Sequence, residues 1–269
     1  MLVVKIGGAS GVNINAIVTD IANQTASGEK LIVVHGGSEL ATELGEQLGH
    51  PPRFVTSASG HTSRYTDKRT LEIFLMATGL LNRRLVGQLQ NLGINAFGLS
   101  GLDGRLLVAE RKSTIRIVEN GKRKILRDDY TGRITNVNIE TIRALQYTGH
   151  IPVVAPVAIS DSGGVALNVD GDRAAARLAG AIEANKLVIL SNVSGLLSDL
   201  ADPNSYIPNI STNDIDDAIN NIARGRMKRK LIAAREALDA GVKQVIIANG
   251  KIDQPITKAL KGEGTLING

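Results

Sequence analysis

The stretch LVVKIGGAS, residues 2–10, decides the fold, because it reads as a buried strand that ends in paired glycines. A short apolar run bounded by a glycine turn is typical of a strand that is covered on both faces of a sheet. The pattern recurs in LIVVHGGS, residues 31–38, after a helix-like segment at 13–25. This alternation of strand and helix predicts a parallel sheet, and therefore an α/β protein.

The strand and helix pattern continues along the rest of the chain, with one interruption. We expect further strands at 94–99, 151–155, 165–169, 186–190 and 243–248, and helices at 68–92, 138–147, 173–184 and 226–240. The interruption lies between them, where two β-branched runs flank Glu119-Asn120-Gly121. An Asn-Gly pair between alternating runs predicts a β-hairpin over 114–126.

Composition excludes several classes of protein. The chain has 269 residues, 43% of them hydrophobic, so it can bury a substantial core. It lacks cysteine and has four scattered histidines, which excludes disulfides and thiolate metal sites and makes any protein-held metal improbable. The net charge of +5 favours acidic ligands, while the aromatic content of 3% argues against base-stacking nucleic-acid modules. No segment has the length of a membrane span. We expect a cytoplasmic protein that binds neither nucleic acid nor membrane.

The chain reads as one domain, 1–269, with two lobes. We place the boundary near 161–165, where an apolar strand gives way to Asp-Ser-Gly-Gly, so the lobes cover about 1–162 and 163–269. The turn-rich stretch 199–213 is expected to be a loop over the site. Helix 68–92 carries apolar residues on more than one face. Such a helix is either internal or covered by another subunit, and we predict a homodimer that forms through it.

Three glycine turns are candidate phosphate sites: Gly7-Gly8, Gly36-Gly37 and the stretch 192–195. Glycines at strand ends let backbone N–H groups approach a phosphate, and a following helix adds its positive end. Each pair could also simply make a tight turn. Neither of the two common signatures, GxxxxGK[ST] and GxGxxG, occurs in the chain. Lys5 precedes the first turn within an apolar strand, so it is either a phosphate ligand or a lysine that snorkels from an edge strand.

Two charged clusters adjoin predicted helix starts. Asp170 and Asp172 precede the helix at 173–184, where they could bind a cation, act as acid and base, or cap the helix. The run from Arg224 to Lys230 has five basic residues in seven and no acid. Positive charge is unfavourable at a helix start, so a polyanion such as ATP is one reason for it, and a solvated basic turn is the other.

The order of the motifs is more specific than any one of them. They are KIGG at Lys5, HGG at His35, SRYTD at Ser63, GLSGLDGRL at Gly98, ALNVDGD at Ala166, SNVSGLL at Ser191 and GRMKRK at Gly225. Together they resemble the amino-acid kinase family over essentially the whole chain, closest to its acetylglutamate-kinase-like branch. Within that branch the chain is most similar to kinases that act on aminoadipate or glutamate attached to the carrier protein LysW, in lysine and arginine biosynthesis.

The resemblance implies a three-layer αβα sandwich and phosphoryl transfer from ATP, with Mg²⁺ brought by the nucleotide, to a carboxylate. Matched position by position, it implies Lys5, Asp172 and Lys230 as the catalytic residues. The substrate-binding residues that it implies are Gly36, Gly37, Arg64 and Asn168. The nucleotide-binding residues that it implies are Gly8, Ser191, Asn192, Gly195 and Leu196. The lobe 1–162 then takes substrate and carrier, and the lobe 163–269 takes the nucleotide.

Four positions depart from the typical acetylglutamate kinase, which has asparagine at Asp170, aspartate at Asn192, glycine at Ser38 and valine at Tyr65. They surround the expected acyl-amino-acid pocket and nucleotide lip, and so favour a substrate other than free N-acetylglutamate. The stretch 111–133 has eight basic residues against three acids, which suits the docking of an acidic carrier and equally suits a solvated hairpin. An N-acetylglutamate kinase and a non-catalytic nucleotide sensor are the alternative functions.

Overall fold

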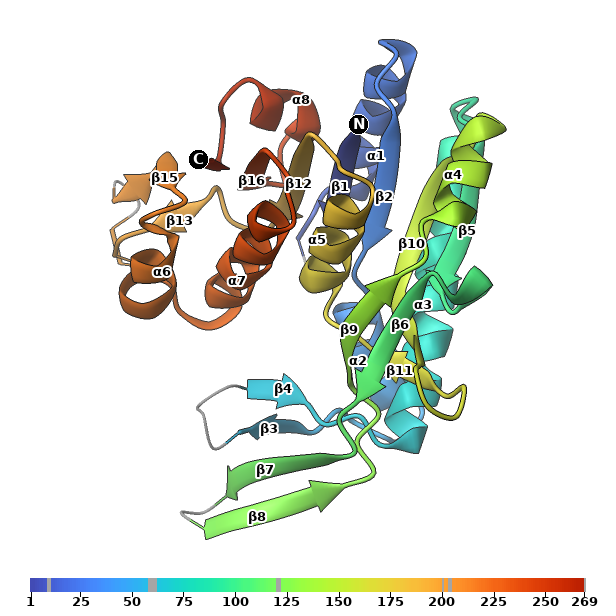
Figure 1. Cartoon of the computed structure of the whole chain (residues 1–269), viewed down its shortest axis with the longest axis vertical. Coiled ribbons are helices and arrows are strands. Elements are labelled where there is room, and N and C mark those ends of the chain that lie inside the picture. The colour runs from blue at the N-terminus through green and yellow to red at the C-terminus, as the bar shows by residue number, and fades with distance from the viewer. Residues whose placement is uncertain (9–10, 58–61, 120–121, 200, 203–204, 269) are drawn as a thin grey trace.

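The computed structural model describes residues 1–8, 11–57, 62–119, 122–199, 201–202 and 205–268 (Figure 1). Its main sheet runs in the order β15-β17-β16-β12-β1-β2-β10-β6-β9, and β5 and β11 pair with β10. The strands of this sheet are β1 (Leu2–Ile6), β2 (Leu31–His35), β5 (Ala96–Gly101), β6 (Leu107–Arg111), β9 (Gly132–Val137), β10 (Ile151–Ser160), β11 (Ala166–Asn168), β12 (Lys186–Ser191), β15 (Asn209–Ser211), β16 (Gln244–Asn249) and β17 (Thr265–Asn268).

Strand β1 lies in the interior of this sheet. It pairs in parallel with β12 on one side and with β2 on the other, so that Lys5 lies opposite Ile189 and Val34. Every residue of β1 and β2 is buried, as their continuous apolar runs predict. The mostly parallel sheet is confirmed, and the interpretation of Lys5 as a lysine on an edge strand is wrong.

Helices cover both faces of the sheet, which confirms the three-layer αβα sandwich. They are α1 (Ile14–Ala26), α2 (Ser38–Gln47), α3 (Lys68–Asn91), α4 (Glu140–Tyr147), α5 (Gly171–Ala181), α6 (Ile215–Asp217), α7 (Gly225–Asp239) and α8 (Pro255–Leu260), with short η1 (Asp103–Arg105) and η2 (Ala218–Ile222). Successive side chains of a strand point to opposite faces, so Val3 packs with α5 and α7 while Leu2 and Val4 pack with α1, α3 and α8. In the described part of the chain, no helix has the length and apolar content needed to cross a membrane.

Two hairpins project from the body as an arm (Figure 1). The arm consists of β3 (Phe54–Thr56) with β4 (Thr62–Arg64), and of β7 (Thr114–Glu119) with β8 (Lys122–Arg127). A bridge between Ser57 and Ile117 joins the two hairpins, and Ile117 is buried between them. The predicted hairpin is therefore confirmed, although its Asn120-Gly121 turn lies outside the described residues. The sequence did not indicate β3 and β4, which are three residues long each.

Several boundaries differ from those expected. Strand β10 runs on to Ser160 and turns back into β11, its antiparallel partner, so residues 161–165 form a hairpin turn at the expected lobe boundary. The stretch 199–213 is not simply a loop, because β14 (Tyr206–Ile207) pairs with β13 (Leu196–Leu197) and β15 adds an edge strand beside β17. The sequence also gave no expectation for α2, β6, β9, α8 or β17.

Candidate active site

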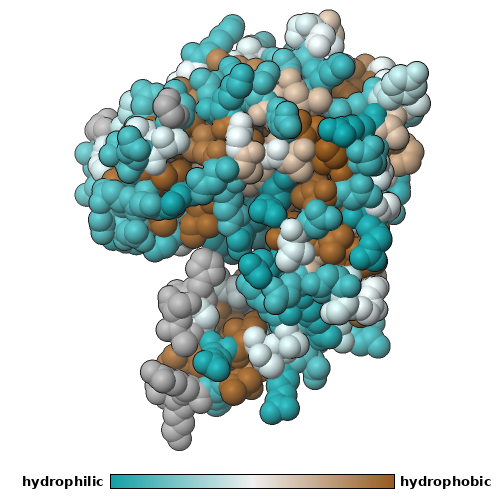
Figure 2. Space-filling view, viewed as in Figure 1, coloured by the Kyte–Doolittle hydropathy of each residue, from teal (hydrophilic) through white to brown (hydrophobic). Residues whose placement is uncertain are grey.

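A cleft of about 1700 Å³ opens between the body and the arm. Figure 2 shows its mouth as a notch above the arm. The carboxyl ends of β1, β2 and β12 meet here, together with the first turns of α5 and α7, because the ends of parallel strands share one edge of a sheet. All twelve site residues that the sequence suggested line this cleft.

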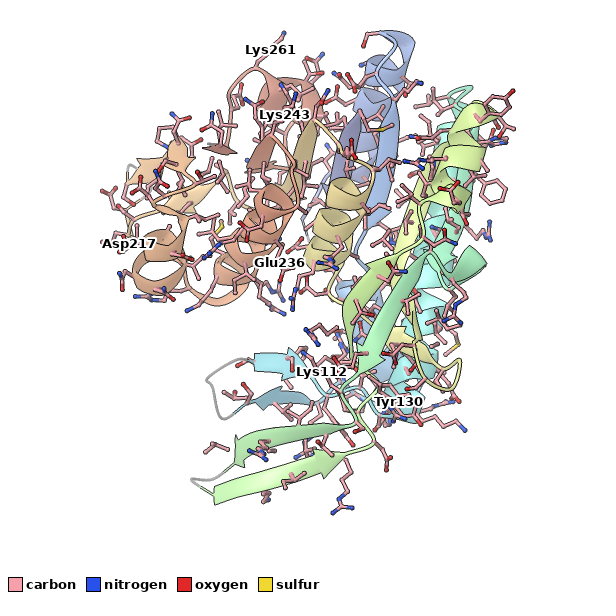
Figure 3. The ribbon with its side chains drawn as sticks, viewed as in Figure 1. Lys112, Tyr130, Asp217, Glu236, Lys243 and Lys261 are labelled. Carbon is pink, nitrogen blue, oxygen red and sulfur yellow. The ribbon has the colours of Figure 1, made fainter. Side chains whose placement is uncertain are left out.

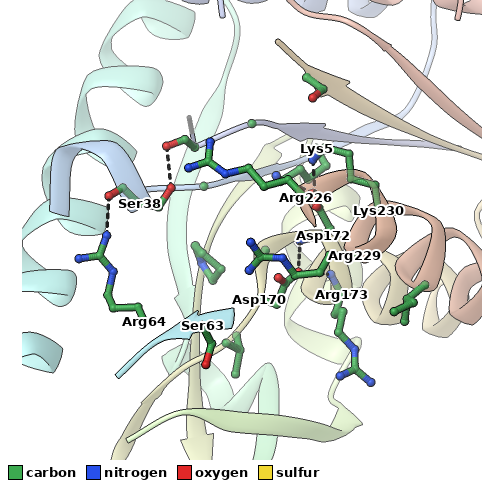
Figure 4. A pocket seen from close by; sticks show the side chains of 18 of the residues that line it. Lys5, Ser38, Ser63, Arg64, Asp170, Asp172, Arg173, Arg226, Arg229 and Lys230 are labelled. Atoms are coloured by element: carbon green, nitrogen blue, oxygen red, sulfur yellow. Dashed lines mark hydrogen bonds and ion pairs between the residues drawn. The ribbon is translucent and has the colours of Figure 1, made fainter. Parts of the chain in front are cut away.

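Two lysines and one aspartate form the centre of the cleft (Figure 4). Lys5 Nζ lies 2.6 Å from Asp172 Oδ1, and Lys230 Nζ lies 3.0 Å from Asp172 Oδ2. The three residues belong to β1, α5 and α7; Lys5 is 5% exposed, Asp172 7% and Lys230 8%. A buried charge needs a partner of opposite sign, and this triad leaves one positive charge in excess. Its net charge suits an anion that enters the cleft.

The triad perturbs the pKa values of its members. Burial opposes ionisation of Asp172, but the ammonium groups of Lys5 and Lys230 outweigh it and hold the pKa of that carboxyl well below its ordinary value. Burial lowers the pKa of Lys230, and the neighbouring Lys5 lowers it further, while Asp172 opposes both effects. Asp172 therefore stays ionised at neutral pH and keeps the two like charges apart.

The first two glycine turns pack directly against each other. A Cβ on Gly8 would lie 2.5 Å from the nitrogen of Gly37, and a Cβ on Gly36 would lie 2.4 Å from the Cα of Gly8. Backbone hydrogen bonds fix the contact: Gly36 N donates to Ile6 O and Glu39 N donates to Gly8 O. Glycine is therefore required here because two main chains approach closely, and this brings both turns to the same wall of the cleft.

A buried polar network holds the second turn. His35 Nδ1 donates to Gly36 O at 2.6 Å, and Asn82 Nδ2 of α3 contacts His35 Nε2 at 3.1 Å and donates to Val153 O at 2.8 Å. Burial lowers the pKa of His35 to about 4, partly opposed by the bond to Gly36, and Lys5 lowers it further. The ring is thus neutral at pH 7 and serves as a support for the turn.

The third turn follows β12, the strand that pairs with β1 on the side away from β2. Gly195 has a φ of 158°, and a Cβ there would meet the Oγ1 of Thr265 and the ring of Tyr206, each at 2.6 Å. Leu196 N donates to the same Oγ1 of Thr265 at 2.8 Å. Ser191 and Asn192 precede this turn and line the cleft with it. The turn therefore continues the same edge of the sheet as the two crossed glycine turns, on the other side of β1 from β2.

Arg64 and Asn168 lie on the arm side of the cleft. Arg64 Nη2 donates to Ser38 O at 2.9 Å and to Thr42 Oγ1 at 2.8 Å, and its guanidinium lies 5.1 Å from the ring centroid of Phe54. Burial lowers the pKa of Arg64 from its ordinary high value. Asn168 Nδ2 donates to Thr66 Oγ1 at 3.1 Å. Both side chains are therefore oriented by neighbours before any ligand binds.

The two aspartates of the 170–172 pair have different roles. Asp170 Oδ1 accepts from the backbone nitrogens of Asp172 and Arg173 at 2.9 and 3.1 Å, so it is the N-cap of α5. Asp172 instead turns to the lysines. Of the four positions that depart from acetylglutamate kinases, Ser38, Asp170 and Asn192 line the cleft. Tyr65 is not among the lining residues, and its hydroxyl donates to Arg127 O at 2.6 Å.

Basic residues dominate the cleft wall, where ten of the lining side chains are lysine or arginine against five acids. Arg226 and Arg229 from α7 point into the cleft beside the triad (Figure 4). Arg173 and Arg177 of α5 and Arg133 of β9 also line it, although the sequence did not indicate them as site residues. The spacing of Arg173 and Arg177 places them on one helix face, which was a detectable signal. Arg173 Nε donates to Glu236 of α7 at 2.9 Å, which ties the two helices together.

Comparisons with a family model and with individual relatives agree on one family. The model of the amino acid kinase family matches residues 1–249. The [LysW]-aminoadipate kinase of Deinococcus radiodurans is 50% identical over 269 residues, which cover 100% of this chain and 91% of the relative. The protein of the same name from Thermus thermophilus is 48% identical, over 99% of this chain and 100% of the relative. A [LysW]-aminoadipate/[LysW]-glutamate kinase of Saccharolobus islandicus is 40% identical over 99% of both chains.

Solved structures share the fold. An N-acetylglutamate synthase from Neisseria gonorrhoeae, complexed with coenzyme A and N-acetyl-glutamate, superposes with a TM-score of 0.80 at 25% identity over 100% of this chain and 59% of its own. A carbamate kinase from Giardia lamblia bound to AMP-PNP superposes with a TM-score of 0.71 at 15% identity, over 99% of this chain and 98% of its own. The architecture is thus shared well beyond the range of close sequence identity.

Proposed function

The chain belongs to the amino acid kinase family, and we propose that it transfers the γ-phosphoryl group of ATP to the side-chain carboxylate of α-aminoadipate, and of glutamate, carried by LysW. The product is an acyl phosphate on the carrier, and the reaction serves lysine and arginine biosynthesis. The names of relatives up to 50% identical over the whole chain support this substrate. The observation that carries the chemistry is the buried triad of Lys5, Asp172 and Lys230 in the cleft.

The triad suits a reaction that consists mainly of positioning and charge stabilisation. A carboxylate nucleophile has a pKa of about 4.3 and is already ionised at neutral pH, so it attacks without a general base. We propose that Lys5 and Lys230 contact the transferring phosphoryl group from two sides, and that Asp172 holds them. One preorganised donor of this kind contributes about 3–4 kcal/mol to transition-state stabilisation, or roughly 10²–10³ in rate.

The walls of the cleft suggest how the two substrates divide it. We propose that the γ-phosphate meets the crossed turns at Gly8 and that the rest of the nucleotide lies along Ser191, Asn192, Gly195 and Leu196, within the lobe 163–269. The acyl-amino-acid then lies against Gly36, Gly37, Arg64 and Asn168, within the lobe 1–162. The crossed turns bring the backbone of Gly8 and Gly37 together at one wall of the cleft, where their N–H groups can face a phosphate. Mg²⁺ would arrive with ATP, held mostly by phosphate oxygens.

The outer face of the β7–β8 hairpin is the proposed contact for LysW. Alternation along the paired strands puts Arg116, Val118, Ile125 and Arg127 on one face, and all four are exposed. Val118 is 44% and Ile125 59% exposed, so this face combines positive charge with apolar surface. Such a face can attract an acidic carrier and then bury area against it. Arg111 and Arg133, counted with the hairpin in the sequence, belong to β6 and β9 instead.

The homodimer remains a proposal, and α3 supplies its support. One face of this helix packs on the sheet through Leu85 and Leu89, while Met76 and Leu80 are 47% and 41% exposed. Phe97 of β5 is a further exposed apolar side chain. Unpartnered apolar residues on a long helix suit an interface with a second copy. Light scattering at micromolar concentration should give about twice 28.4 kDa, and a monomer mass would contradict the dimer.

Hydroxylamine trapping of acyl phosphate tests the function directly. The enzyme is incubated with MgATP and, in parallel, with LysW bearing aminoadipate, LysW bearing glutamate, and free N-acetylglutamate. We expect hydroxamate from the carrier conjugates and little from the free amino acid. Comparable kcat/KM on N-acetylglutamate would instead indicate an acetylglutamate kinase. A Lys230→Met variant serves as the control for enzyme-dependent signal.

A further inference from the structure

The proposed carrier-binding hairpin and the substrate side of the cleft meet at one buried junction. We use the name arm junction for Tyr65 and Thr66, which follow β4, for residues 129–131, which precede β9, and for Asn168, which ends β11. Figure 3 shows Lys112 and Tyr130 at this point, where the arm leaves the body. Segments far apart in the sequence are therefore held together at the base of the arm.

Asp129 is the hub of the arm junction. The residue has no exposed surface, and its Oδ1 accepts from the backbone nitrogen of Thr66 at 3.0 Å. Its Oδ2 accepts from the backbone nitrogen of Thr131 at 3.3 Å and from the Thr131 hydroxyl. Burial raises the pKa of Asp129, and these hydrogen bonds oppose that change. One carboxylate thus joins the segment after β4 to the segment before β9.

Thr66 connects this hub to the cleft. Its Oγ1 accepts from Asn168 Nδ2 at 3.1 Å and donates to Arg64 O at 3.3 Å. Tyr130 N donates to Thr66 O at 2.7 Å, and Asn168 N donates to Tyr130 O at 2.9 Å. Thr66 therefore determines the orientation of the Asn168 amide. It also fixes the main-chain position of Arg64.

Both ends of the β7–β8 hairpin are anchored at the same place. At the outgoing end, Tyr65 Oη donates to Arg127 O at 2.6 Å. At the incoming end, Lys112 N donates to Thr131 O at 2.9 Å, and the Arg111 guanidinium lies 3.7 Å from the centroid of the Tyr130 ring. A shift of the hairpin relative to the body must change these contacts. Because Thr66 directly follows Tyr65 in the chain, the shift is passed from Tyr65 to Thr66. From Thr66 it is passed to Asn168 through their hydrogen bond.

We propose that Tyr65 and Thr66 are positioning residues that couple docking of the acidic carrier on the hairpin to the orientation of Asn168 and Arg64 in the cleft. This inference rests on the proposed function. Tyr65 links the hairpin to the junction, and Thr66 links the junction to the cleft. A tethered substrate gains from the coupling because its carrier and its reacting end contact the two sides of the junction. A free amino acid contacts only the cleft and gains nothing from Tyr65.

Kinetics on two substrates separate this coupling from a merely structural role. The substrates are LysW bearing aminoadipate and a short N-acyl dipeptide that ends in aminoadipate and lacks the carrier. Tyr65→Phe removes one hydroxyl, and we expect kcat on the carrier conjugate to fall about 3- to 10-fold while kcat on the dipeptide is unchanged. Thr66→Val should lower kcat on both, and Thr66→Ser, which keeps the hydroxyl, should restore it. KM for ATP should stay within twofold, and Tyr147→Phe, at a 93% exposed site away from the cleft, is the matched control.

Two kinetic results would overturn the inference: equal loss on both substrates with Tyr65→Phe, or a Thr66→Ser enzyme as slow as Thr66→Val. Hydrogen exchange gives an independent readout with LysW that carries no substrate. Peptides covering 64–66 and 129–131 should exchange more slowly when LysW binds the wild type, and this protection should be lost in Tyr65→Phe. Protection confined to the hairpin would refute the coupling. A wild type without activity on the conjugate would instead refute the proposed function.

Discussion

Replacement of Asp172 by asparagine tests the electrostatics of the triad. The substitution keeps the shape but removes the negative charge that Lys5 and Lys230 both contact, at 2.6 and 3.0 Å from its two oxygens. At an effective dielectric constant of about 20, each contact contributes roughly 5.5–6.5 kcal/mol of Coulomb energy. Desolvation of the buried charges offsets much of this. Removal of one member of a buried ion pair typically costs about 3–5 kcal/mol, and we expect that loss in the free energy of unfolding at pH 7.

The pH dependence of that loss follows from the lysines. Burial and Lys5 already lower the pKa of Lys230, and without Asp172 its pKa falls further. Between this lowered value and the ordinary value near 10.5, the unfolded chain binds more protons than the folded chain, so stability rises with pH. Because the pKa of Lys230 is lower in the variant than in the wild type, the variant should recover part of its deficit as the pH rises from the lower of these two folded-state pKa values to the higher. MgATP, whose phosphates can replace the missing charge, should stabilise the variant more than it stabilises the wild type.

Urea denaturation with and without MgATP at several pH values measures both effects. Asp170→Asn is a matched control two residues away, because asparagine caps a helix about as well as aspartate, and it should cost about 0.5 kcal/mol or less. A loss below about 1 kcal/mol with Asp172→Asn, or a deficit that does not change with pH, would refute the account of the triad as a buried, charge-coupled unit.

Three further predictions follow from the same structure. Lys230→Met should lower kcat about 10²- to 10³-fold in the hydroxamate assay, because one phosphate-directed ammonium is lost, and a loss below tenfold would contradict its proposed role. Gly8→Ala places a Cβ 2.5 Å from the nitrogen of Gly37 and should cost about 1–3 kcal/mol of stability and weaken nucleotide binding, whereas Gly87→Ala, in open space on α3, should not. The His35 imidazole has a pKa of about 4 in the folded chain and 6.5 in the unfolded chain. Between pH 6.5 and pH 4 this imidazole is therefore protonated mainly in the unfolded chain, and the free energy of unfolding falls as the pH drops. The loss in the free energy of unfolding is about 3 kcal/mol, and His35→Gln should remove it. Identical pH profiles of stability for the wild type and His35→Gln would show that the pKa of His35 is not lowered by folding.

The sheet and the composition of the site could be predicted from local patterns. Strands of five residues that are mostly apolar and end in glycine turns are a strong signal for buried parallel strands. Parallel strands bring their carboxyl ends to one edge of the sheet. Lys5 and Lys230 are far apart in the sequence. The position of each could nevertheless be predicted from the strand or helix to which it belongs. Their distances to Asp172 could not be predicted, because these depend on how α5 and α7 pack on β1.

The arm junction could not be predicted from sequence patterns, for a physical reason. Tyr65 was recognised as a departure, but its partner is the main-chain oxygen of Arg127, and a carbonyl has no signature in the sequence. Strands β3 and β4 have three residues each, too few for periodicity to distinguish them from a loop. Helix α2 was missed because only two of its ten residues, Ala41 and Gly45, are buried.

The interior position of β1 affects how the chain folds while it is being made. This strand leaves the ribosome well before one of its two neighbours, β12, which begins only at Lys186. Helix α1 also forms some of its contacts only after α8 has been made. Asp20 of α1 accepts from the backbone nitrogens of Ile256 and Thr257 at 2.7 and 2.8 Å. At about 5–20 residues per second, the edge of β1 that β12 will cover remains open for roughly 10–40 s of synthesis. A nascent chain with this topology offers a mostly apolar strand to other chains or to chaperones until residue 186 and the rest of β12 have been translated.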